Sequence, residues 1–354
     1  MQKPRARDLG LPFPGTPGPF NAITDVAGVT VGFCTLTDPA RQMRTGVTVV
    51  RPRQDKGIPQ PVWAGQFTLN GNGEMTGTHW IHDAGYFIGP LAITNTHAIG
   101  AVHHGVTQWM IRHYDAFFGG GHGWAMPVVA ETFDGTLNDI NALHVTPDHA
   151  AFAINAAKGG PVEEGSTGGG NGMIAYEFKG GTGTSSRRVH LAGQDYRVGA
   201  LVQANHGRRE WLTVLGKPVG KLMPEGSFRQ KEVGSIIVYI ATDAPLSPLS
   251  LQHLARRAAI GIGRGGTPSG NSSGDIFLAF SVANAGPMPQ MDGPLVQRQE
   301  LNHEGLDPIY LAAVEAVEEA VINALVAGVD VEAVTPKGLT VRAIDCERLA
   351  ALFR

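Results

Sequence analysis

The sequence predicts a layered α/β fold. Short, continuous apolar runs alternate along the chain with segments that carry helix-start signals. Strands that are apolar on both faces belong to sheets covered on both sides, so helices are expected outside the sheets. Apolar residues make up 42% of the 354 residues and charged residues 17%, which supplies a large core and little material for a disordered tail.

Six apolar runs have the pattern of buried strands. They are rich in Val, Ile, Leu and Ala, and most are followed within a few residues by Pro, Asn or Asp. The predicted strands cover residues 46–50, 91–94, 128–130, 198–204, 236–241 and 276–282.

Three helices are predicted from their first residues. Thr146 and Ser247 each stand before a proline, as an N-cap residue followed by a proline at the first helical position. These two helices are expected to end near the glycines at 159–160 and 261. The third and longest begins at 307–308. Its predicted apolar stripe consists of Leu311, Val314, Val317, Val321 and Leu325. The polar residues expected on its opposite, outward face are Glu315, Glu318, Glu319 and Asn323.

Charge and cysteine content narrow the classes of partner. The net charge is −3 and no basic block occurs, so nucleic acid and membrane surfaces are not expected as partners.

Cys34 and Cys346 lie near opposite ends of the chain, which favours a reducing compartment over a disulfide framework. The first residues lack the apolar core of a secretory signal, and no apolar run is long enough to span a membrane. A cytoplasmic location is therefore expected.

One serine lies in a segment whose residues match a catalytic consensus sequence. Ser272 lies in the run GNSSG, which satisfies the G-x-S-x-G pattern of a nucleophile elbow. That elbow requires a strand before the serine and a helix after it. Here a loop comes before the serine and an apolar strand follows, so the context disfavours Ser272 as the nucleophile.

The Gly234–Ser235 junction offers a different serine. It joins the polar, loop-like residues 222–234 to the most apolar predicted strand. If the bond before Ser235 is broken, the hydroxyl gains a neighbouring α-amine, whose ordinary pKa of about 7.7–8.0 suits a general base. N-terminal nucleophiles are activated in this way, and a glycine before the cut leaves room for the hydroxyl to approach the carbonyl. Gly-Ser pairs are common before strands, so these residues alone favour Ser235 only modestly.

Segments from the whole chain carry a family resemblance. The junction reads GSIIVYIATDAPL from Gly234. The other segments are RARDLG from Arg5, NGNGEMTG from Asn70, TNTH from Thr94, PVVAET from Pro127, LND from Leu137, GGTGTSSR from Gly180, VQAN from Val202 and SGDI from Ser273. Together they resemble the L-aminopeptidase/D-Ala-esterase/amidase family, peptidase family S58, which includes the β-peptidyl aminopeptidases.

The resemblance implies a fold and a reaction. The fold is a four-layer αββα sandwich of the N-terminal-nucleophile type, made as a precursor and cut into an α chain, residues 1–234, and a β chain, residues 235–354. The reaction releases the N-terminal residue of a small peptide, amide or ester that has a free amino group, with D- and β-amino-acid substrates within the family's range. No cofactor and no metal are implied, and the expected assembly is a homo-tetramer.

Individual roles follow from the same resemblance. Ser235 is the nucleophile, and its free amine is the base. Asn205 resembles the side-chain donor of the oxyanion hole. Ser273 and Asp275 resemble the serine and acid that contact the nucleophile and its amine. Glu131 matches the carboxylate that binds the substrate's ammonium group. The glycine-rich loops at 168–172 and 180–183 are expected to shape the pocket.

Three alternatives stay open at this point. The 13 histidines allow a metal-dependent hydrolase, although no HExxH motif occurs. The glycine-rich run 180–188 ends in two arginines and could cradle a phosphate in a non-catalytic nucleotide-binding protein. An acyl transferase of the ornithine acetyltransferase type is a third candidate, but that type has threonine at the cut, so Ser235 favours hydrolysis.

Overall fold

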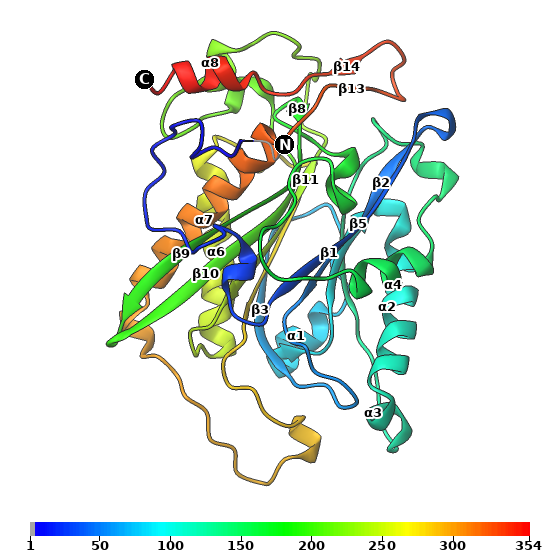
Figure 1. The fold of residues 1–354 in the computed structure, drawn as a ribbon, viewed down its shortest axis with the longest axis vertical. Helices are drawn as coiled ribbons and strands as arrows, with labels where there is room; N and C mark the ends of the chain where they lie inside the picture. The colour runs from blue at the N-terminus through cyan, green and yellow to red at the C-terminus, as the bar shows by residue number, and fades with distance from the viewer. Residues whose placement is uncertain (1–3) are drawn as a thin grey trace.

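Two β-sheets face each other in the computed structural model, which describes residues 4–354 (Figure 1). The four-stranded sheet has the order β1 (Thr30–Asp38), β2 (Met43–Arg51), β5 (Leu91–Asn95), β6 (Val128–Thr132). The six-stranded sheet has the order β4 (Tyr86–Phe87), β3 (Val62–Gly71), β12 (Gly274–Ser281), β11 (Ser235–Thr242), β10 (Gln194–Asn205), β9 (Gly181–Leu191). Within the second sheet β11 and β12 are parallel, whereas β10 and β11 are antiparallel.

Helices cover the outer face of each sheet. Helices α2 (Ile99–His113) and α4 (Pro147–Asn155) pack on the four-stranded sheet, and α6 (Pro248–Arg264) and α7 (Asp307–Val326) pack on the six-stranded sheet (Figure 1). This layer order confirms the predicted αββα sandwich. The smaller elements are α1 (Thr78–Ala84), α3 (Asp115–Gly119), α5 (Val219–Leu222), α8 (Cys346–Ala351), β7 (Ile174–Ala175), β8 (Phe178–Lys179), β13 (Val331–Glu332) and β14 (Thr340–Val341).

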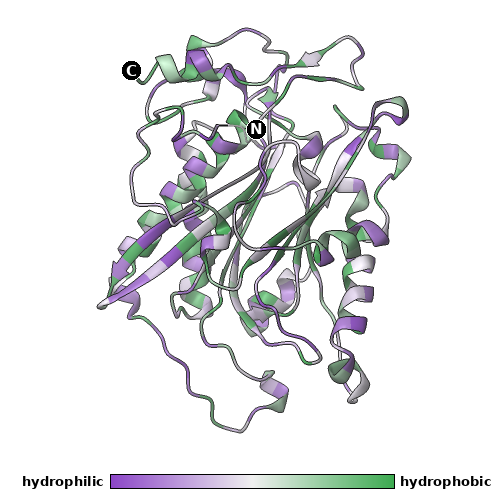
Figure 2. Cartoon of the chain, viewed as in Figure 1, coloured by the Kyte–Doolittle hydropathy of each residue, from purple (hydrophilic) through white to green (hydrophobic). Residues whose placement is uncertain are grey.

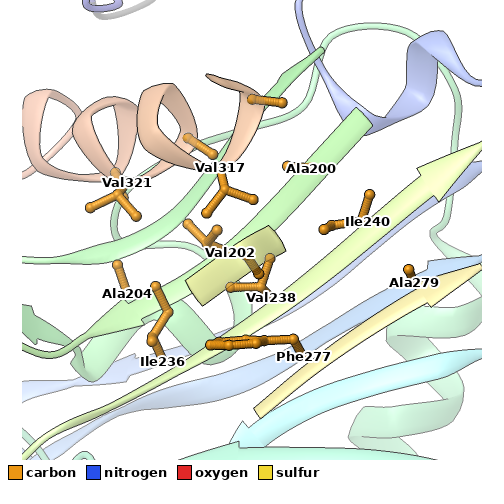
Figure 3. Close-up of a cluster of buried hydrophobic side chains, with 14 of the residues drawn as sticks. Ala200, Val202, Ala204, Ile236, Val238, Ile240, Phe277, Ala279, Val317 and Val321 are labelled. Atoms are coloured by element: carbon orange, nitrogen blue, oxygen red, sulfur yellow. The ribbon is translucent and has the colours of Figure 1, made fainter. Parts of the chain in front are cut away.

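Strand β11 is apolar throughout its length because both of its faces are buried. Side chains alternate between the two faces of a strand. Ile237, Tyr239 and Ala241 belong to the core between the sheets, where the Tyr239 hydroxyl donates a hydrogen bond to the carbonyl of Ala92 at 2.9 Å. The other face packs toward α7, as the labelled side chains Ile236, Val238, Ile240, Val317 and Val321 show (Figure 3). Both faces of the strand are therefore buried.

Strands β9 and β10 are more polar at their far ends, where they are exposed. In Figure 2 the central strands are largely hydrophobic in colour, whereas the far ends of β9 and β10 turn hydrophilic. Exposed Arg188 and Asp195 form an ion pair there. Among the described residues, no helix is long and apolar enough to cross a membrane.

All six predicted strands are present, but two helix ends differ from the prediction. Helix α4 ends at Asn155, before the glycines expected to close it. Helix α6 runs through Gly261 and ends at Arg264. A β-carbon on Gly261 would press against the side chain of Val317 in α7. This glycine therefore allows two helices to approach closely and does not terminate one.

The predicted outward face of α7 is wrong. All four polar residues predicted to face outward are buried, and Leu311 of the predicted buried stripe is 51% exposed. The acids are paired: Glu319 with Arg7 and Arg187, Glu315 with Arg187, and Glu318 with Arg264. The helix is covered by the sheet, by α6 and by residues near the amino terminus. The charged side of α7 therefore lies in the protein interior.

The glycine-rich segments also differ from expectation. Residues Gly168–Gly172 form a buried 3-10 helix, η5, packed against β2, and residues 181–191 form the strand β9. A β-carbon on Gly183 would overlap the carbonyl oxygen of Ala320 in α7, so this glycine serves close packing. Arg187 is held in ion pairs inside the protein. Residues 181–187 of this run are thus a buried part of β9 and not an exposed phosphate-binding loop, and only Arg188 is exposed.

Candidate active site

Ser235 is the first residue of β11, in the middle of the six-stranded sheet. It lies opposite Asn205 of β10 and opposite Gly274 of β12. Its hydroxyl oxygen accepts a hydrogen bond from the Gly274 N–H at 3.1 Å, and the residue is 6% exposed. Hydrogen-bonded strands on both sides therefore fix the place of this side chain.

Gly234 has no room for a side chain. A β-carbon at this position would overlap the carbonyl oxygen of Asn205. Residues 223–233, which precede it, form no helix or strand, so the predicted loop is present except at Leu222, which ends α5. The absence of a side chain at Gly234 is thus a steric requirement of how the loop enters β11.

Asn205 ends β10 and is held on both sides of its amide. Its nitrogen donates to the carbonyl of Phe133 at 2.9 Å, and its oxygen accepts from the N–H of Ile174 at 2.8 Å. Since the amide nitrogen carries two N–H groups, the contact with Phe133 uses one of them. The residue that pairs with Ser235 in the sheet therefore has a firmly oriented side chain.

Ser273 and Asp275 form a hydrogen-bonded unit at the start of β12. The Ser273 hydroxyl donates to one carboxylate oxygen of Asp275 at 2.7 Å, and the Ser269 hydroxyl donates to the other. Burial raises the pKa of Asp275 above its ordinary value, while the two hydroxyls act in the opposite direction. The contact from this strand to Ser235 comes from the N–H of Gly274, which lies between the two residues.

Glu131 comes from the other sheet, near the end of β6. It is 4% exposed, and its carboxylate accepts from the Glu74 N–H at 3.0 Å and from the Thr96 hydroxyl. Burial raises the pKa of Glu131, and these two hydrogen bonds lower it in part. A buried carboxylate with an elevated pKa beside a cavity is typical of a functional group.

Ser235 and Glu131 line the same cavity, which has a volume of about 480 Å³. The other lining residues are Asn72, Gly73, Glu74, Thr96, Phe133, Val233, Gly234 and Ser272. The two sheets thus each contribute one candidate functional side chain to a common cavity. The expected glycine-rich loops are not part of this lining.

Ser272 also reaches this cavity, but it lies in a turn that is followed by β12. The strand-before, helix-after order of a nucleophile elbow is therefore absent at this serine. Among residues 4–354, no group of three or more His, Cys, Asp or Glu side chains is arranged to hold a metal ion.

Sequence reasoning missed the residues that hold the reactive groups. Thr96 and Ser269 each donate a hydroxyl to a buried acid, and Glu232 is itself a buried acid in the loop before the junction. Thr96 lies within the TNTH segment, a signal that could have suggested it. Ser269 and Glu232 carry no comparable local signal.

Comparisons with known proteins agree with this geometry. The model of peptidase family S58 matches residues 21–338. The beta-peptidyl aminopeptidase BapA of Sphingosinicella microcystinivorans is 47% identical, over 99% of this chain and 92% of that protein. The solved structure of the L-aminopeptidase D-Ala-esterase/amidase from Ochrobactrum anthropi has a TM-score of 0.95 and 55% identity, covering 99% of this chain and 98% of that one. A Burkholderia sp. beta-aminopeptidase has a TM-score of 0.89 and 47% identity, covering 98% of each chain.

The resemblance inferred from the sequence is confirmed by these matches, which extend over nearly the whole chain. The sandwich architecture agrees with that of the Ochrobactrum anthropi enzyme, which is described as a variant of the Ntn hydrolase fold. The chain belongs to peptidase family S58 and is a hydrolase of the aminopeptidase class.

Proposed function

We propose that Ser235 is the nucleophile of this aminopeptidase and becomes the N-terminus of a β chain, residues 235–354, when the bond after Gly234 is cut. The observation that carries the proposal is the shared cavity: a serine at the start of a central strand and a buried carboxylate from the opposite sheet line one space. A nucleophile and an ammonium-binding acid are the two groups that an aminopeptidase needs there.

Self-cleavage begins with attack of the Ser235 hydroxyl oxygen on the carbonyl carbon of Gly234. The peptide C–N bond breaks and an ester forms, so that the nitrogen of Ser235 becomes a free amine. Water then hydrolyses the ester, which leaves a carboxylate on Gly234 and restores the hydroxyl. The lack of a side chain at Gly234 supports this step, because the serine approaches the carbonyl without obstruction.

Peptide hydrolysis uses the same atoms with a substrate in place of Gly234. The free amine takes the proton of the Ser235 hydroxyl as the oxygen attacks the carbonyl of the substrate's N-terminal residue. The leaving amine departs with a proton, and water hydrolyses the acyl-enzyme. The firmly oriented amide of Asn205 would donate to the developing oxyanion, a contribution that can reach roughly 2.7–4 kcal/mol. Ser273 and Asp275 would orient the new amine.

The substrate is proposed to be a short peptide, amide or ester with a free amino group. Glu131 would bind that group as an ammonium ion, and the exposed ring of Phe133 supplies an apolar wall beside it. Two of the similar proteins are named for β-amino-acid substrates, which supports including N-terminal β-residues. Assembly into a homo-tetramer and a cytoplasmic location stay predictions.

Intact mass spectrometry of wild type and Ser235→Ala tests the proposal. Wild type is expected as two pieces, residues 1–234 and 235–354, whereas the variant stays one chain without aminopeptidase activity. Ser272→Ala is the matched control, because Ser272 lines the same cavity, and it should be processed and active. A wild type that stays full length yet hydrolyses aminoacyl amides would contradict the proposal. So would an active Ser235→Ala beside an inactive Ser272→Ala.

A further inference from the structure

Glu232 is a buried acid in a loop that is otherwise largely polar and exposed. It stands three residues before Ser235 and is 5% exposed, whereas its neighbours Lys231 and Val233 are exposed. Burying a carboxylate is costly unless it is hydrogen-bonded. The partners of Glu232 therefore indicate why the loop turns this side chain inward.

The two carboxylate oxygens of Glu232 bind two different parts of the sheet. One accepts the N–H of Gly207 at 2.5 Å, and the other accepts the N–H of Gly270 at 2.8 Å. Gly207 follows β10, and Gly270 comes before β12. These strands flank β11, so Glu232 connects the backbone on both sides of the place where the junction enters the sheet.

Both donors are glycines with no space for a side chain. A β-carbon on Gly207 would press into the ring of Tyr176, and one on Gly270 would overlap the Glu232 carboxylate. The charged groups that face the carboxylate are Arg229 and Asp275. The two glycines thus form a close-fitting backbone site that the carboxylate of Glu232 occupies.

We propose that Glu232 is a positioning residue for self-cleavage, an inference that rests on the proposed cut after Gly234. With Glu232 anchored to both flanking strands, only Val233 and Gly234 separate a fixed point from Ser235. So short a tether keeps the Gly234 carbonyl beside the serine hydroxyl. Once the bond is cut, the anchor no longer constrains Ser235, so the effect belongs mainly to processing and much less to peptide hydrolysis.

The test compares Glu232→Gln with Glu225→Gln, the same change at an exposed acid of the same loop. Each protein is made by pulsed cell-free synthesis, and the conversion of full-length chain into two pieces is followed by mass spectrometry. Misplacement by about 1 Å can cost on the order of a hundredfold in rate, so Glu232→Gln is expected to be processed roughly ten- to a hundredfold more slowly. Glu225→Gln should match wild type.

A second measurement separates positioning from a general loss of structure. Peptide hydrolysis is measured per processed subunit, and the loss in processing rate should exceed the loss in hydrolysis by at least about tenfold, because only processing depends on the tether. Equal losses in both would assign Glu232 a merely structural role and overturn the inference. Thermal unfolding in the Ser235→Ala background shows whether each precursor folds.

Glu232→Asp covers the case in which Glu232→Gln does not fold. It keeps the charge but is too short to reach both glycine amides, so it should also slow processing. Wild-type processing rates in a folded Glu232 variant would contradict the inference while leaving the proposed cut intact. If wild type itself is not cleaved, the proposed self-cleavage is wrong, and the inference about Glu232 is wrong with it.

Discussion

At the residue scale, Glu131, the proposed partner of the substrate's ammonium group, is a buried carboxyl beside the cavity. Burial raises the pKa of this carboxyl, so the ionised form is less favourable in the empty site than in water. When folding raises the pKa of an acid, the free energy of unfolding falls as the pH rises above the pKa that the acid has in the unfolded chain. A substrate ammonium bound beside Glu131, as proposed, would reverse this preference, so that binding and ionisation would support each other.

Glu131→Gln should therefore raise KM for substrates with a free amino group much more than it changes kcat. A hydrogen bond to a charged group contributes about 1.5–3 kcal/mol, which corresponds to roughly a ten- to hundredfold rise. In wild type, KM should also rise as the pH falls and protonates Glu131, whereas the variant should lack this dependence. Steady-state kinetics across pH measures both effects.

The control for this prediction is Glu74→Gln. Glu74 lines the same cavity and its charge acts to raise the pKa of Glu131, but only its backbone N–H is hydrogen-bonded to Glu131, so this variant should keep its KM within a few-fold. An equal rise in KM for both variants would contradict the assignment of Glu131 as the ammonium partner.

At the element scale, α7 carries an ionic cluster through its buried side. Glu319 accepts from Arg187 at 2.8 Å, from Arg7 at 2.9 Å and from Asn21 at 2.5 Å. The helix thereby connects the strand β9 to residues near the amino terminus. The acids are tolerated inside because each has a cationic partner, which is the condition for burying a charge.

Glu319→Gln is expected to lower the free energy of unfolding by about 3–5 kcal/mol, since it leaves two buried or partly buried arginines without this carboxylate. Urea unfolding monitored by circular dichroism measures the change. Glu304→Gln, at an exposed site just before α7, should stay within about 0.5 kcal/mol of wild type. A loss below about 1 kcal/mol at Glu319 would show that the cluster stabilises the helix little.

At the scale of the whole molecule, the proposed cut leaves strands of the six-stranded sheet in both pieces, while the helices α6 and α7 that pack on this sheet belong to one piece. Residues 235–354 supply β11, β12, α6 and α7, whereas residues 1–234 supply the strands β10 and β3 that pair with β11 and β12. Helix α7 packs on β9 and β10, and α6 packs on β3. Neither piece contains a complete core.

The cut protein should therefore behave as one folded unit. In native gel filtration the two pieces should elute together, and thermal unfolding should show a single cooperative transition. They should separate only in denaturant. Elution of two separate folded pieces under native conditions would contradict the buried position of β11 between β10 and β12.

Part of the candidate site could be predicted from local patterns. The meeting of a polar loop and an apolar strand favoured Ser235 modestly, whereas Glu131 was assigned through the family resemblance. That these residues, far apart in the chain, line one cavity depends on how the two sheets face each other. The sequence segments suggested this pairing only through resemblance to a family.

Local sequence patterns were enough to predict six strands and the starts of three helices, because apolar runs, N-caps and prolines act on neighbouring residues. The burial of Glu319, the helix contact at Gly261 and the inward turn of Glu232 depend instead on the packing of distant segments. The physical reason is the same in each case. Burial depends on what distant segments place over a side chain, and a local pattern contains no information about that cover.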